Sequence, residues 1–208
     1  TGGGFAALLA GWSLYAALAV AGLAGIAAVA LYAHDVVKLY RTRRRLELEL
    51  NMRMALLAFG SLAVAVVLPV PLAAFAGAER ATGAAVYLVA FGWLSGLGLA
   101  MLYKIVPFMT WLECYGPVLG RSPTPRVQDL VSEAHAMPWF LLYFASAWVG
   151  TAALALGSGS ALRGAAFGML VATGAIVLNL ARARMLSEVA GEDRLPAGTR
   201  RPAWSDPS

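Results

Sequence analysis

The chain contains two histidines, His34 and His135, and these are candidate cofactor ligands. His34 closes a long apolar block beside Asp35, and His135 comes just before another apolar block. Haem and redox sites in helical bundles use ligands such as histidine, held at mid-membrane depth. Neither histidine belongs to an HxxxH pair, and we expect both at the membrane interface, on the same side. Two interpretations stay open: a shared bis-histidine cofactor site, or two interfacial residues that each bond to a neighbour.

Lys104 is a third candidate, because it is the charged residue closest to the interior of an apolar block. An ionisable side chain within a membrane span is a functional candidate by default. Pro107 follows three residues later, and this favours an aliphatic stem lying on the apolar face with its ammonium at the lipid head groups. Glu113 is nine residues away, which is too far for a contact on one helix face.

Four glycines form two GxxxG motifs, Gly92–Gly96 and Gly164–Gly168. This spacing places both glycines of a pair on one helix face and lets a second backbone approach closely. Such pairs also arise by chance in a chain rich in alanine and glycine. We interpret them as helix-packing positions, within the chain or against a partner subunit, rather than as parts of a catalytic site.

The elements that must position these residues are membrane spans. Hydrophobic residues make up 60% of the 208 residues and charged residues 13%. A soluble domain of this size leaves about a third of its surface in water, so it could not hide that much apolar surface. The net charge of +5 does not indicate nucleic acid, because the basic residues lie between the apolar blocks. The single cysteine, Cys114, excludes an internal disulfide and a CxxC motif.

The fold class that we expect is an all-α integral membrane bundle. A span needs about 20 apolar residues to cross a hydrocarbon core of about 30 Å. Pro69 and Pro71 should bend or end the second span. The expected transmembrane helices are five, over about residues 5–33, 55–77, 84–106, 137–156 and 161–181.

A short amphipathic helix is expected at about residues 125–135. Pro125 suits its first position. Apolar residues then recur with helical spacing on one face, at Val127, Leu130, Val131 and Ala134. Such a helix would lie on the membrane surface or on a partner. We expect residues 1–186 to form the membrane domain and 187–208 a poorly ordered cytoplasmic tail, rich in charge, proline and glycine.

The orientation follows from the basic residues. Six lie after the first span, three around the end of the third and five after the fifth, whereas the opposite side holds only Arg80 and Arg163. Because basic residues favour the cytoplasmic side, the N-terminus should lie outside and the C-terminus in the cytoplasm. That arrangement is natural for the C-terminal part of a longer polytopic chain. The basic run over 38–45 could also bind anionic lipid.

The stretch over 92–111, with the core Tyr103-Lys-Ile-Val-Pro-Phe108, and the prolines of 115–125 carry a resemblance. They resemble the C-terminal half of polytopic bacterial membrane proteins related to haem-copper oxidase subunit I, a group that includes NnrS-like proteins. The resemblance implies a location in the bacterial inner membrane. The haem and copper ligands of that family are mid-span histidines, and no residue of this chain matches them, so no catalytic or metal-binding residue is carried over.

Three functions follow as hypotheses. The first is a non-catalytic membrane subunit, or the cofactor-free half, of a multi-subunit redox or energy-converting complex, with membrane lipid and other membrane subunits as partners. The second is part of a haem-copper-oxidase-like enzyme whose ligands lie in an N-terminal half, so that haem is possible although this chain has no ligand pattern. The third is a transporter, which would need broken spans with polar groups at the midplane.

Overall fold

The computed structural model of the chain describes residues 49–121 and 123–189, together with residues 20, 22–28, 30–32, 34, 35, 37, 38 and 41. Every regular element in these ranges is helical, which confirms the all-α class. The elements are α2 (Leu50–Val67), α3 (Pro69–Ala76), α4 (Ala78–Tyr87), the π-helix η1 (Leu88–Ser95), α5 (Gly96–Tyr115), the 3₁₀ turns η2 (Gly116–Val118) and η3 (Val127–Leu130), α6 (Glu133–Leu156) and α7 (Gly159–Arg184).

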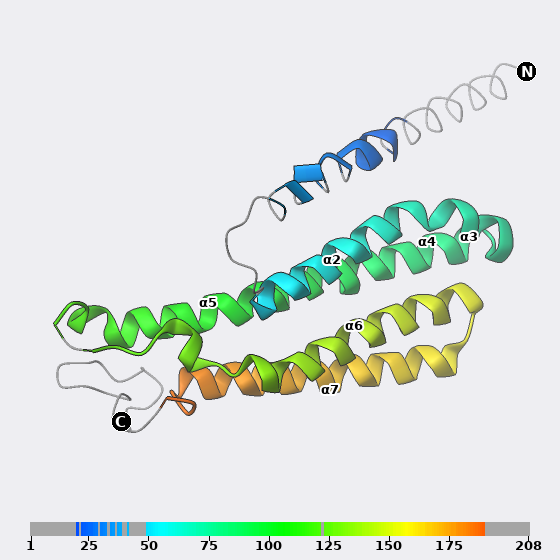
Figure 1. Ribbon diagram of the computed structural model, residues 1–208. Helices are drawn as coiled ribbons and strands as arrows, with labels where there is room; N and C mark the ends of the chain where they lie inside the picture. The colour runs from blue at the N-terminus through cyan, green and yellow to red at the C-terminus, as the bar shows by residue number, and fades with distance from the viewer. Residues whose placement is uncertain are drawn as a thin grey trace, which may run out of the picture.

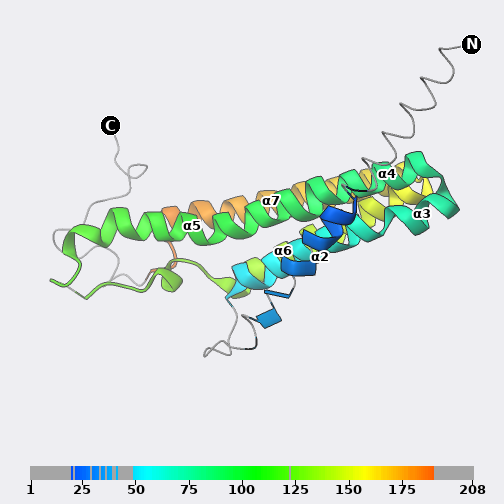
Figure 2. The same cartoon turned by 90° about the horizontal axis from the view of Figure 1, so that it is seen from above.

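The helices form two layers. Helices α2, α3 and α4 lie over α6 and α7, while α5 continues the line of α4 and runs on past the start of α2 (Figures 1 and 2). Four helical stretches are long and apolar enough to cross a membrane: Leu50–Val67, Ala78–Val118, Glu133–Leu156 and Gly159–Arg184. The predicted first span, 5–33, falls largely outside the described residues. A total of five spans therefore stays a prediction.

Two ends of the bundle differ in character. At one end, which we call the turn end, lie the connections α3–α4 and α6–α7, where Gly77 (φ 86°) and Gly157 (φ 71°) adopt conformations that favour glycine. Arg80 lies there against Gly157, 3.2 Å from the position of an added Cβ. At the other end, which we call the collar end, helices α2 and α6 begin and α7 finishes.

The prolines have different effects on their helices. Helix α2 ends at Val67, and Pro69 opens α3, as expected for a residue without a backbone donor. Pro107, in contrast, lies inside α5, which continues to Tyr115. The third span therefore extends beyond its predicted end at residue 106. A proline removes one hydrogen bond, and here residues on both sides of it, Tyr103 and Thr110, are buried and hold the helix in place.

The predicted amphipathic helix over 125–135 is wrong as a continuous helix. The structure has one 3₁₀ turn, Val127–Leu130, followed by extended backbone at Val131 and Ser132. Ser132 is the N-cap of α6, since its Oγ accepts a hydrogen bond from the backbone N–H of His135 (3.4 Å). A serine in this role starts a new helix, so the apolar periodicity across it does not belong to one element.

The longest span contains the π-helix η1. There Ser95 Oγ donates to the carbonyl of Ala90 (2.9 Å), and Tyr143 of α6 donates to the carbonyl of Phe91 (2.9 Å). A π-helix widens the turn and leaves carbonyls available to side chains. It therefore gives α6 a polar attachment inside an apolar bundle.

Two cores hold the chain together. The main core is formed by α2, α5, α6 and α7, around buried residues such as Met54, Tyr103, Phe140 and Ile176. A smaller core joins the α5 extension to the chain after α7, through Cys114, Tyr115, Leu130, Leu186 and Val189. The packed unit thus reaches Val189, beyond the predicted domain boundary at 186, while residues 190–208 lie outside the described ranges.

Candidate functional site

Polar side chains gather at the collar end. Lys104 Nζ lies 2.7 Å from Glu49 Oε2, and Gln128 Nε2 donates to Glu49 Oε1 (3.4 Å). Tyr103 donates to the carbonyl of Ser132 (3.0 Å). We call Glu49, Lys104, Gln128 and Glu133 the polar collar. Lys104 thus pairs with a glutamate 55 residues away in the chain.

Glu133 joins two helix starts. Its Oε2 accepts a hydrogen bond from the backbone N–H of Leu50 (3.1 Å), 83 residues away. Glu49, the N-cap residue of α2, makes no capping bond with its own side chain. The first N–H groups of a helix have no partner within the helix, and a carboxylate near them is stabilising. Glu133 therefore caps α2 from the first turn of α6.

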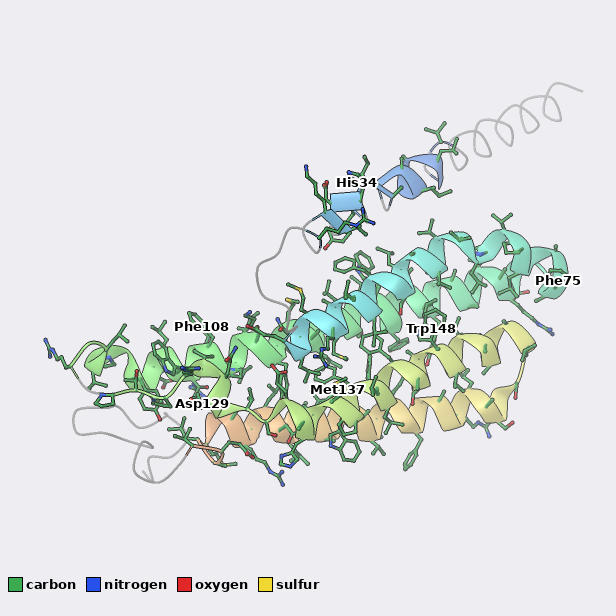
Figure 3. The ribbon with its side chains drawn as sticks, in the orientation of Figure 1. His34, Phe75, Phe108, Asp129, Met137 and Trp148 are labelled. Atoms are coloured by element: carbon green, nitrogen blue, oxygen red, sulfur yellow. The ribbon has the colours of Figure 1, made fainter. Side chains whose placement is uncertain are left out.

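The collar surrounds a cavity of about 280 Å³. Its lining comes from the start of α2, the middle of α5, the loop before α6 and the first residue of α6: Glu49, Asn51, Tyr103, Lys104, Pro107, Phe108, Arg126, Val127, Gln128, Val131 and Glu133. Figure 3 shows Phe108 on α5 and Asp129 on the neighbouring loop at this end of the molecule. Acidic, basic and amide side chains thus line one cavity that also has an apolar wall. This arrangement suits the binding of a ligand rather than one particular reaction.

A second polar pair connects α7 to the extension of α5. Arg184 Nη2 lies 2.5 Å from Glu113 Oε2, and Arg184 Nη1 lies 3.2 Å from Thr110 Oγ1. The side chains of Arg184 and Glu113 are 22% and 34% exposed, so this ion pair is more sheltered than the pair of Lys104 and Glu49, at 57% and 39%. Glu113 does not pair with Lys104, in agreement with the spacing argument.

An apolar groove, which we call the α5–α7 groove, lies beside the contact between α5 and α7. Two hollows, of about 650 and 760 Å³, lie in line along these helices. Their α7 side runs from Leu162 to Arg184, and their other side runs from Tyr87 to Glu113. Lining residues recur at every third or fourth position on both sides, so the groove follows one face of each helix. The Glu113–Arg184 pair lies at its collar end.

The two histidines are not brought into a recognisable site. His34 is exposed on the N-terminal segment (Figure 3), whose Tyr32 ring contacts Phe59 of α2. His135 is exposed in the first turn of α6, where its backbone N–H meets Ser132. Within the described ranges, no group of three or more His, Cys, Asp or Glu side chains could hold a metal ion. A bis-histidine site stays an untested prediction.

The four predicted packing glycines differ in their surroundings. A Cβ added at Gly92 would lie 2.8 Å from Ser61 Cβ, and one at Gly96 would lie 2.8 Å from the ring of Phe144. Gly168 faces the hydroxyl of Ser146, but Gly164 has nothing within 4 Å.

A fifth close approach was not predicted. A Cβ added at Gly150 would lie 2.5 Å from Tyr87 Oη, and this glycine belongs to no GxxxG motif. The phenol of Tyr87 donates to the sulfur of Met169 (3.3 Å), so α4, α6 and α7 meet around Gly150. Gly150 can be recognised as a packing position only from the Tyr87 side chain that lies against it, because the sequence around Gly150 contains no packing motif.

Comparison with known proteins adds no relative. No protein family, curated protein or solved structure matches the chain.

Proposed function

We propose that the chain is a non-catalytic membrane subunit, or the cofactor-free half, of a larger redox or energy-converting membrane complex, and that it acts through helix packing. The observation that carries the proposal is the α5–α7 groove. We propose a redox or energy-converting complex only because residues 92–125 resemble membrane proteins related to haem-copper oxidase subunit I.

The groove has the dimensions of a site for one membrane-spanning helix. Its α7 side covers residues 162–184, which is about 33 Å at 1.5 Å per residue, and the hydrocarbon core is about 30 Å thick. Its walls carry exposed apolar side chains, among them Ile105, Met109, Leu170 and Val177. Small and apolar walls that follow helical spacing suit another helix.

The N-terminal segment of this chain lies elsewhere. The ring of Tyr32 lies 4.5 Å from that of Phe59 on α2, whereas the main neighbours of α2 are α5, η1, α3, α4 and α6, not α7. The occupant that we propose is therefore a transmembrane helix of a different subunit. Its polar flank would face the Glu113–Arg184 pair.

The orientation belongs to the same proposal. The collar end carries Lys104, Arg126, Arg182 and Arg184, and the turn end carries Arg80 and Arg163. The excess of basic residues favours the cytoplasmic side for the collar end. We propose the bacterial inner membrane as the location, on the resemblance alone.

Filling the groove should release the chain from its assembly. Ala166→Trp and Ala181→Trp would each place an indole in the groove, while Ala152→Trp places the same ring at an exposed position of α6 outside it. The tagged chain would be extracted from its own membrane in mild detergent, and its mass measured by light scattering. We expect a complex with Ala152→Trp and single chains with the groove variants. A complex that survives both groove variants, or one made only of copies of this chain, would overturn the proposal.

The cofactor-free part of the proposal has its own test. We expect the purified chain alone to show no haem bands in a reduced-minus-oxidised optical spectrum and no stoichiometric iron or copper. Haem or copper bound at one equivalent per chain would contradict a cofactor-free role and favour the oxidase-like enzyme.

A further inference from the structure

The side-chain amide of Asn51 opens into the collar cavity. Asn51 is 7% exposed, in the first turn of α2, and it lines the collar cavity. Its side chain makes no hydrogen bond to any residue in the described ranges. Polar groups that face a cavity without a protein partner usually meet a ligand or water. The amide is therefore available to bond a ligand or water in the cavity.

The charges around the cavity define the kind of ligand. Two acids, Glu49 and Glu133, and two bases, Lys104 and Arg126, line it, so it has no net charge. Glu133 uses Oε2 to cap α2, and its Oε1 accepts no bond from the described part of the chain. Lys104 is 57% exposed and keeps donors beyond its bond to Glu49. A lone anion or a lone cation would meet like charge in this cavity, whereas a ligand with both charges would not.

The size and depth of the cavity further limit the kinds of ligand that it can bind. About 280 Å³ is room for roughly nine water molecules at ~30 Å³ each, which accommodates a compact head group. The apolar part of the wall is formed by Pro107, Phe108, Val127 and Val131. The cavity lies beside the first residues of the spans Leu50–Val67 and Glu133–Leu156, and we expect the start of a span at the depth where lipid head groups meet the hydrocarbon.

We propose that the collar cavity binds a phosphoethanolamine head group, that of a zwitterionic phospholipid. The ammonium is held by the free oxygen of Glu133 and by the amide oxygen of Asn51, and the phosphate by Lys104 and Arg126. The acyl chains leave over the exposed ring of Phe108. A choline head group has no N–H to donate to the two oxygens, which distinguishes the two common zwitterionic lipids. The inference is independent of the partner helix proposed above.

Native mass spectrometry of the full chain tests this inference. The protein in detergent is mixed with equal amounts of phosphatidylethanolamine, phosphatidylcholine and phosphatidylglycerol, and retained lipids are counted. We expect phosphatidylethanolamine to be retained about tenfold better than the other two, a difference of the size that one or two charged hydrogen bonds give. Asn51→Leu and Lys104→Met should each abolish the preference. Asn179→Leu, at the other asparagine of the chain, should preserve it.

Two further measurements separate the possible outcomes. Thermal unfolding of Asn51→Leu should occur at or above the temperature of the unmodified chain, because the substitution breaks no hydrogen bond within the described part of the chain. A lost preference would then not reflect misfolding. Displacement of the lipid by soluble phosphoethanolamine would support the same chemistry with a free ligand as its source. Equal retention of the three lipids, or a preference that survives both Asn51→Leu and Lys104→Met, would overturn the proposal.

Discussion

Replacing Gly92 with alanine is expected to force α2 and η1 apart and to lower the free energy of unfolding by about 1–3 kcal/mol, as overpacking does. The added Cβ would lie 2.7 Å from Leu88 Cδ1 and 2.8 Å from Ser61 Cβ. The leucine methyl can rotate away, but Ser61 Cβ is fixed to the α2 backbone and is fully buried. The helices must therefore separate, which also strains the bond from Trp148 Nε1 to Ser61 Oγ (3.2 Å).

The control for Gly92 lies on the same long span. Gly98 and, in α7, Gly164 have nothing within 4 Å of an added Cβ, so alanine at either should be neutral or slightly stabilising through its higher helix propensity. Thermal unfolding in detergent, followed by circular dichroism, compares the three variants. Equal melting temperatures for Gly92→Ala and Gly98→Ala would show that the α2–η1 contact is not as close as described.

Replacing Glu133 with alanine should have the second largest effect. The variant leaves the N–H of Leu50 without its acceptor, and Leu50 is 1% exposed. A buried donor without a partner costs about 1–3 kcal/mol, and the loss of an acid from the first turn of α6 adds to this. The expected result is a lower melting temperature, together with faster amide hydrogen exchange at the start of α2.

Two variants separate the effect of losing the hydrogen bond to Leu50 from the effect of losing the charge of Glu133. Glu133→Gln keeps an oxygen that can accept from Leu50 N, so it should recover most of the stability. Glu79 is also an acid in the first turn of a helix, α4, but it is exposed, and Glu79→Ala should change stability little. If Glu133→Ala and Glu79→Ala behave alike, Glu133 is only a surface charge and the two helix starts are not coupled through it.

Both predictions concern the way in which a chain with few polar groups fixes its helices. In the bundle, close approach at Gly92 and Gly96 specifies which faces meet. At the collar end, charged side chains from distant parts of the chain specify which helix starts lie together. In lipid, burial of apolar surface does not distinguish one apolar face from another. Shape and hydrogen bonds must therefore supply the specificity.

The sequence by itself determined the class of the fold and the approximate position of four spans. Long apolar blocks determine helices because every backbone group in lipid must be bonded internally. The break at Pro69 was also predictable, since proline lacks the donor that continues a helix. That the ammonium of Lys104 reaches the lipid head groups stays a prediction, and the structure shows that the span continues beyond it to Val118.

Which residues of the chain contact one another was decided only by the tertiary structure. The sequence does not distinguish Gly164 from Gly168 or Gly92 from Gly96, because a motif records spacing along one helix and not the neighbour that faces it. Pro107 remained helical because the buried residues on both sides of it hold α5 in place. Ser132 split a periodic segment because it caps α6. Glu49 and Glu133 meet Lys104 and Leu50 across 55 and 83 residues. Such pairs depend on the packing of whole helices, so they cannot be predicted from the spacing of residues along the chain.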